Sequence, residues 1–186
     1  MIRLPTQNTI MRISVWLSSF LLIMTFGFAQ YHPVESGSKV QFTIKNFGFN
    51  VGGSFRGIRG DIRFNPDSLS GARFEVTVEA STINTDNDLR DGHLREDNYL
   101  GVKNYPHIRF VSENVRDHKR KGEYEMTGKL TIKDKTRSIS FPFTAVGSGK
   151  GYLFTGSFKI NRKDFDIGGS STISDNLTVS LKVLAD

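Results

Sequence analysis

Two short polar segments carry the side chains best suited to chemistry. Arg90, Asp91 and His93 lie close together, and Arg162 and Asp164 form a second group nearer the C-terminus. An arginine guanidinium binds phosphate or carboxylate, a neutral histidine can donate to a carbonyl or hydroxyl, and a carboxylate orients either one. These five residues are therefore candidates for binding the polar head group of a ligand. The alternative is structural, because the same Arg–Asp pairs could pin loops onto the rest of the fold.

Most other catalytic and metal-binding patterns are missing from the chain. It contains no cysteine, which excludes a thiol nucleophile, a cysteine-ligated metal and an iron–sulfur cluster. The histidines His32, His93, His107 and His118 lack the paired spacing of a metal site, and there is no G-x-S-x-G nucleophile elbow. We therefore expect no metal, no cofactor and no enzymatic activity. The alternative is a lipid-modifying enzyme that uses His93 and Asp91 as an acid–base pair.

Alternation of apolar and polar residues with a period of two dominates the chain and predicts β-strands. In the clearest segment, residues 72–81, Phe74 and Val76 alternate with Arg73 and Glu75. Turn residues separate eight such segments, at 39–45, 54–64, 72–81, 108–115, 124–132, 139–143, 152–160 and 177–183. The sequence therefore predicts an all-β protein with short connections.

An eight-stranded antiparallel meander normally closes into a barrel, because closure removes the exposed strand edges. Alternation alone leaves two arrangements open: apolar faces inward in a soluble barrel, or outward in a transmembrane barrel with a polar lumen. The polar faces carry bulky charges such as Lys39, Glu75 and Lys182, too many for so narrow a lumen. We therefore expect a soluble, lipocalin-like barrel, with a short helix or ordered loop near residues 85–100 covering one end.

Inward-pointing apolar faces predict a lumen lined by aromatic and aliphatic side chains. The residues expected to point into it are Phe42, Phe74, Phe110, Tyr124, Met126, Phe141, Phe143, Phe154, Phe158, Leu177, Val179 and Leu181. The residues alone leave open whether these side chains fill the lumen or leave a cavity for an apolar ligand. Burial of one CH₂ contributes about 0.8 kcal/mol, so about ten ordered methylenes could contribute on the order of 8 kcal/mol before ordering costs.

The N-terminal segment predicts a signal peptide. Arg3 and Arg12 are followed by the apolar run 13–28, and small residues precede the expected cleavage site. We expect residues 1–29 to be removed and residues 30–186 to form one domain, in the periplasm or secreted. Removal lowers the basic residues from 25 to 23 against 19 acidic residues, a net charge of +4.

Positive charge is concentrated at one place in the chain, residues 118–121 together with Arg116. Such a cluster at a predicted hairpin tip is typical of a solvated loop, and the alternative is transient contact with anionic lipid head groups. The remaining charges are scattered, so we do not expect nucleic-acid binding. No pattern indicates a stable protein partner.

The order of several short motifs resembles the YceI-like family of exported polyisoprenoid-binding proteins. The matching segments are residues 34–36, 38–42, 53–57, 83–85, 90–95, 104–112, 128–133 and 161–165. The resemblance covers about residues 31–186. Glu35, Gly37 and Asp166 depart from the usual family pattern, and they lie near strand ends where a head group would sit. These departures leave the identity of the ligand open.

The resemblance implies a function and a location. It implies an elongated pocket in the barrel for an isoprenoid, quinone or other long-chain amphiphile, and a periplasmic or secreted address. We therefore expect a lipid-binding or carrier protein. The resemblance implies no catalytic residues in this chain.

Overall fold

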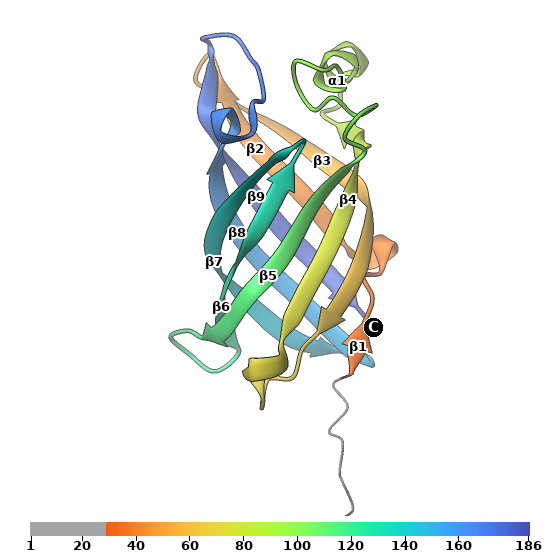
Figure 1. Cartoon of the computed structure of the whole chain (residues 1–186), viewed down its shortest axis with the longest axis vertical. Coiled ribbons are helices and arrows are strands. Elements are labelled where there is room, and N and C mark those ends of the chain that lie inside the picture. Colours follow the sequence, from red (N-terminus) through yellow and green to blue (C-terminus); the bar gives the residue numbers. More distant parts are fainter. Residues whose placement is uncertain (1–28) are drawn as a thin grey trace, which may run out of the picture.

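The chain forms a closed antiparallel β-barrel with a short helix beside one rim (Figure 1). This computed structural model describes residues 29–186, so the predicted signal peptide lies outside the described residues, apart from Ala29. The strands are β1 (Gln30–Tyr31), β2 (Lys39–Asn46), β3 (Phe49–Arg63), β4 (Arg73–Asn84), β5 (His107–Asp117), β6 (Glu123–Ile132), β7 (Lys135–Ser148), β8 (Gly151–Asn161) and β9 (Ile173–Ala185). The helical elements are α1 (Asp88–Leu94) and three 3₁₀ turns, η1 (Glu35–Gly37), η2 (Leu69–Gly71) and η3 (Arg162–Phe165).

The barrel is an up-and-down meander. Strands β2 to β9 pair in chain order, and β9 returns to β2 to close the sheet. In that closing pair, Val40 lies opposite Leu181 and Phe42 opposite Val179. The predicted eight-stranded antiparallel barrel is confirmed, and the short helix α1 falls within the predicted insert. The difference is β1, an additional two-residue strand that pairs with the end of β3.

Several strands are longer than their apolar pattern. β7 runs to Ser148, well past the apolar segment 139–143, and only Gly149 and Lys150 separate it from β8. The reason is that ladder hydrogen bonds come from the backbone, so pairing continues where the side chains are polar or small. In β3, register shifts lie on both sides of Arg56, and Gly57 has a φ of +70°, which marks a bulge there.

The apolar faces point into the barrel and the charged faces point to solvent. Phe74 is buried, whereas the neighbouring Glu75 lies on the outer face and pairs with Arg73 and Arg109. The hydrogen bond from Arg109 is the largest cause, and that from Arg73 the second, of a lowered Glu75 pKa. A transmembrane barrel presents an apolar band in this position. The outward-facing apolar arrangement is therefore wrong.

The two ends of the barrel are built differently. One end, which we call the mouth, is surrounded by the β2–β3 hairpin, α1 and its following loop, the β6–β7 hairpin and the β8–β9 connection (Figure 1). The other end, the closed end, carries the β3–β4, β5–β6 and β7–β8 connections, together with β1 and the C-terminus. The basic cluster at residues 118–121 is the β5–β6 tip, and it therefore lies at the closed end.

Loops around the mouth are tied to the barrel and to one another. The Asn87 side chain accepts a hydrogen bond from the backbone N–H of Arg90, which caps α1. The Arg95 guanidinium donates to the backbone carbonyls of Ser81 and Ile83, which fastens the end of α1 to β4. The backbone N–H of Gly168, in the β8–β9 connection, donates to the carbonyl of Asn98. The mouth is therefore an ordered rim.

Candidate functional site

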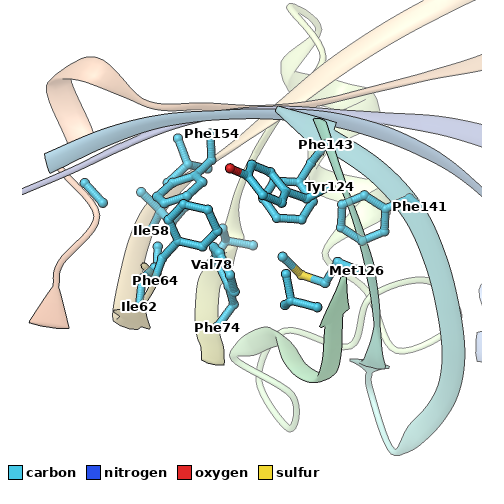
Figure 2. Close-up of a cluster of buried hydrophobic side chains, with 13 residues drawn as sticks. Ile58, Ile62, Phe64, Phe74, Val78, Tyr124, Met126, Phe141, Phe143 and Phe154 are labelled. Atoms are coloured by element: carbon cyan, nitrogen blue, oxygen red, sulfur yellow. The ribbon is translucent and has the colours of Figure 1, made fainter. Parts of the chain in front are cut away.

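The closed end of the lumen is filled by aromatic side chains (Figure 2). Phe64, which is 1% exposed, lies at the centre of this plug. Its ring centroid is 5.2 Å from that of Tyr124, 5.2 Å from that of Tyr152 and 5.4 Å from that of Phe154, all edge to face. Such geometry is favourable between aromatic rings. No ligand chain fits through this part of the barrel as it is packed.

The half of the lumen nearer the mouth holds an apolar cavity of about 250 Å³. Seven of the predicted lumen residues line this cavity: Phe42, Phe110, Phe141, Phe158, Leu177, Val179 and Leu181. The other five lie in the plug or beside it: Phe74, Tyr124, Met126, Phe143 and Phe154. All twelve therefore point inward, but only the first group borders the main cavity.

Two aromatic residues separate the cavity from the plug. Phe110 and Phe141 have ring centroids 5.9 Å apart and line both the main cavity and a smaller pocket of about 60 Å³ beyond it. A Cβ at Gly128 would lie 2.5 Å from the Phe110 ring, so only glycine allows the ring to rest there. These two rings lie at the inner end of the main cavity, together with Val76, Leu181 and Val183, which also line both spaces.

At the mouth, Asp91 is buried and bound to the end of β4. Its carboxylate accepts hydrogen bonds from the backbone N–H and the hydroxyl of Thr85. The Arg90 guanidinium donates through Nε to the Thr85 hydroxyl and through Nη2 to the Thr85 carbonyl. Arg90 also lines the cavity, and its Nη1 makes no hydrogen bond to any described residue. Of the first predicted group, Arg90 is the residue that lines the cavity, and its Nη1 is left as a donor for a ligand.

Arg162 also lines the cavity at the mouth, but four of its five N–H donors are bound to protein groups. The buried guanidinium donates to the backbone carbonyls of Ser174 and Ile167 and to the carboxylate of Asp175, at 2.9 Å. The pKa of Asp175 is lowered, first by a hydrogen bond from Lys163 and also by Arg162. Arg162 therefore holds the β8–β9 connection against the barrel, and its acidic partner is Asp175 rather than Asp164.

The other two predicted head-group residues face solvent. His93 and Asp164 are both exposed, and neither lines the cavity. His93 and Asp91 are two residues apart on α1, so their side chains leave the helix in different directions. Within the described part of the chain no hydrogen bond joins them, and the acid–base hypothesis gains no geometric support.

The sequence interpretation missed one polar residue of the cavity wall. Asn46, at the end of β2, lines the cavity, and its Oδ1 atom is buried without a hydrogen-bond partner among the described residues. Such an atom can accept a hydrogen bond from a ligand hydroxyl. The alternation of the sequence could have predicted that Asn46 faces the lumen, because it continues the inward series of Phe42 and Ile44.

Within residues 29–186, no group of three or more His, Cys, Asp or Glu side chains is placed to hold a metal ion. None of the helices in the same range has the length and apolar character needed to cross a membrane.

Sequence and structure comparisons agree with one another. The family model described as the YceI-like domain matches residues 31–185. A UPF0312 protein of Shewanella denitrificans is 30% identical over 159 residues, which cover 81% of this chain and 83% of that protein.

Among solved structures, Burkholderia cenocepacia BcnA has a TM-score of 0.77 at 22% identity and covers 81% of this chain and 98% of its own. A polyisoprenoid-binding domain from Saccharophagus degradans has a TM-score of 0.68 at 11% identity and covers 86% and 99%. At these identities the two structures establish a shared fold. The family match over almost the whole described chain shows that the protein belongs to the YceI-like family.

Proposed function

We propose that this protein is an exported carrier that holds one long-chain amphiphile, such as an isoprenoid, a quinone or a fatty chain, in its lumen. The observation that carries the proposal is the one-ended apolar cavity, open at the mouth and stopped by the Phe64 plug. A cavity of this shape favours a molecule that enters chain first. It agrees with the expectation of a single ligand in an eight-stranded barrel.

The size of the cavity indicates how much of the ligand it shields. At about 250 Å³ it is slightly smaller than the pockets that enclose drug-sized ligands, which span roughly 300–1,000 Å³. We infer that it holds the terminal part of a long chain and that the head group stays at the rim. Shielding of the chain from water is the driving force, at about 0.8 kcal/mol for each buried CH₂.

The head group would lie between Arg90 and the mouth end of β2. Arg90 offers Nη1 as a donor to a phosphate, carboxylate or carbonyl oxygen, and Asn46 offers Oδ1 as an acceptor for a hydroxyl. This pair favours a head group that both accepts and donates hydrogen bonds. His93 and Asp164 face solvent, and Arg162 lines the cavity with most of its donors bound to protein groups, so we assign none of the three to the head group.

Export supports a carrier role in the periplasm or outside the cell, since an insoluble lipid must cross water there. The predicted signal peptide over residues 1–29 is consistent with that address.

The test is native mass spectrometry of the protein purified after export, followed by solvent extraction and analysis of what it releases. We expect about one long-chain molecule per protein. Val179→Phe, on the cavity wall, should reduce the occupied fraction by about tenfold or more. Ser180→Phe places the same ring on the outer face of the same strand and should leave occupancy unchanged. A protein that carries no ligand, or a Val179→Phe variant that loads normally, would contradict the proposal.

A further inference from the structure

The mouth of the barrel displays three large apolar side chains to solvent. Phe47 and Phe49, at the β2–β3 hairpin, are 71% and 77% exposed, and Leu89, on α1, is 73% exposed. The hairpin and α1 both rise at the mouth end of the barrel (Figure 1). One further large apolar residue, Val146, is 60% exposed and lies near the closed end of β7. Exposed aromatic rings therefore gather where a ligand would enter.

The Phe47 ring is held in an unfavourable backbone conformation. Phe47 and Gly48 form a two-residue turn with φ values of +50° and +82°, flanked by the paired residues Asn46 and Phe49. Turns of this type favour Asn-Gly, because a bulky side chain at positive φ meets steric strain. The Phe47 side chain is 71% exposed, so its packing offsets little of this strain, although its backbone N–H donates to the Thr172 carbonyl. The sequence therefore places a ring at the tip at the expense of folding stability, which indicates a role outside the fold.

Several cations around the mouth are occupied by protein groups, whereas the exposed Lys45 and Lys103 have no ion pair among the described residues. Lys135 pairs with Asp134 and Asp166, and Lys163 pairs with Asp175. The ammonium of Lys133 donates to the carbonyls of Asp97 and Asp166.

Exposed carboxylates lie beside the apolar tips, namely Asp86 and Asp88 next to Leu89. The dense basic cluster at residues 118–121 is at the other end of the barrel. This surface therefore suits an uncharged or zwitterionic partner better than an anionic one.

The apolar tips are also too small for a stable protein interface. The surface area of three side chains is well below the roughly 800 Å² that each partner buries in a typical complex. The closed barrel offers no free edge among strands β2 to β9 for strand addition. A lipid bilayer, by contrast, accepts a few inserted aromatic and aliphatic side chains without matching their shape.

We propose that the mouth docks on a lipid bilayer by inserting Phe47, Phe49 and Leu89, so that a chain passes between membrane and cavity without crossing water. The transfer of a chain at the membrane rests on the carrier function proposed above. Docking itself needs no cargo, so the two can be tested separately. The probe is a phosphatidylcholine vesicle, with a second preparation containing about one third phosphatidylglycerol.

Sedimentation with these vesicles measures docking. Replacement of both rings, Phe47→Asn with Phe49→Thr, should lower the partition coefficient by about tenfold or more. Phe47→Asn alone should leave thermal stability unchanged or higher, because asparagine is favoured at this turn position. A loss of vesicle binding by this variant would then not result from misfolding. The matched control, Val146→Thr, should bind like the wild type.

Fluorescence gives a second, local measurement. Residues 29–186 contain no tryptophan, so Phe49→Trp introduces a single reporter at the tip of the mature chain. Its emission should shift to shorter wavelength when phosphatidylcholine vesicles are added, whereas Val146→Trp should show no shift.

Docking at the mouth would be overturned if the double variant partitioned onto vesicles like the wild type, or if Val146→Thr lost as much binding as the double variant. It would also be overturned if binding required phosphatidylglycerol and disappeared when Lys119, Arg120 and Lys121 were neutralised. The last result would place docking at the closed end. If a lipid is found in the purified protein but docking fails, only this inference falls. If docking depends on the two rings but no lipid is found, only the carrier function falls.

Discussion

The carboxylate of Asp91 receives both the backbone N–H and the hydroxyl of Thr85, and both residues are buried, at 3% and 6% exposed. These bonds join the inner face of α1 to the end of β4, directly at the mouth. The Thr85 hydroxyl also accepts from Arg90 Nε, so the two residues orient the guanidinium that we assign to the ligand head group. The rim of the cavity therefore depends on this contact.

Asp91→Ala should lower the free energy of unfolding by about 2–3 kcal/mol, because it leaves two buried donors of Thr85 unsatisfied. Urea denaturation measures this change. Amide hydrogen exchange in α1 should accelerate, since the helix loses its attachment to β4. Asp91→Asn keeps one acceptor oxygen and should show a smaller loss. Equal stability of wild type and Asp91→Ala would mean that water replaces the carboxylate at no cost.

Phe64→Ala should destabilise the barrel by about 3–5 kcal/mol, since it removes the central ring of the plug and leaves a cavity. Phe158→Ala deletes the same side chain at the wall of the existing cavity, where the ring is only partly buried, and should have a smaller effect. Chemical denaturation of both variants gives the comparison. If the two losses are similar, the closed end is not the better-packed half.

The two mouth arginines should respond differently to removal. Arg162→Ala should lower the free energy of unfolding by about 2–3 kcal/mol, because the carbonyls of Ile167 and Ser174 lose their partner. Arg90→Ala should have a smaller effect on stability and should instead change the head groups among the co-purified lipids. Denaturation and lipid analysis, applied to both variants, separate the roles. A shift in lipid composition for Arg162→Ala alone would reverse the assignment.

The lowered pKa of Glu75 predicts that the protein loses stability in acid. Hydrogen bonds from Arg109 and then Arg73 lower its pKa in the folded state below that of the unfolded chain. The stabilisation is therefore fully present above the unfolded-state pKa, near 4.5, and is lost as the pH falls through the folded-state value. Glu75→Gln should flatten the dependence of unfolding free energy on pH in this acidic range and should change little at neutral pH. NMR titration of the Glu75 side chain should give a pKa below 4.5.

Local patterns in the sequence determined which residues form strands and which side of each strand is apolar. The alternation around Phe74 and Glu75 predicted the inner and outer faces correctly, because neighbouring side chains in a strand point to opposite sides of the sheet. It also carried the information for Asn46, which continues the series of Phe42 and Ile44. The bulky charges on the polar faces correctly indicated an apolar interior.

Only the tertiary structure decided how far along the barrel axis each inward residue lies. Phe143 and Phe158 have the same type of side chain and the same inward direction, yet one belongs to the plug and the other to the cavity wall. A period of two is a local property, whereas height in the barrel depends on the register of every strand pair and on the closing pair of β2 with β9. The sequence could not predict the partners of Arg162 either. Ser174 and Asp175 contact its guanidinium only after the β8–β9 connection folds back over the rim.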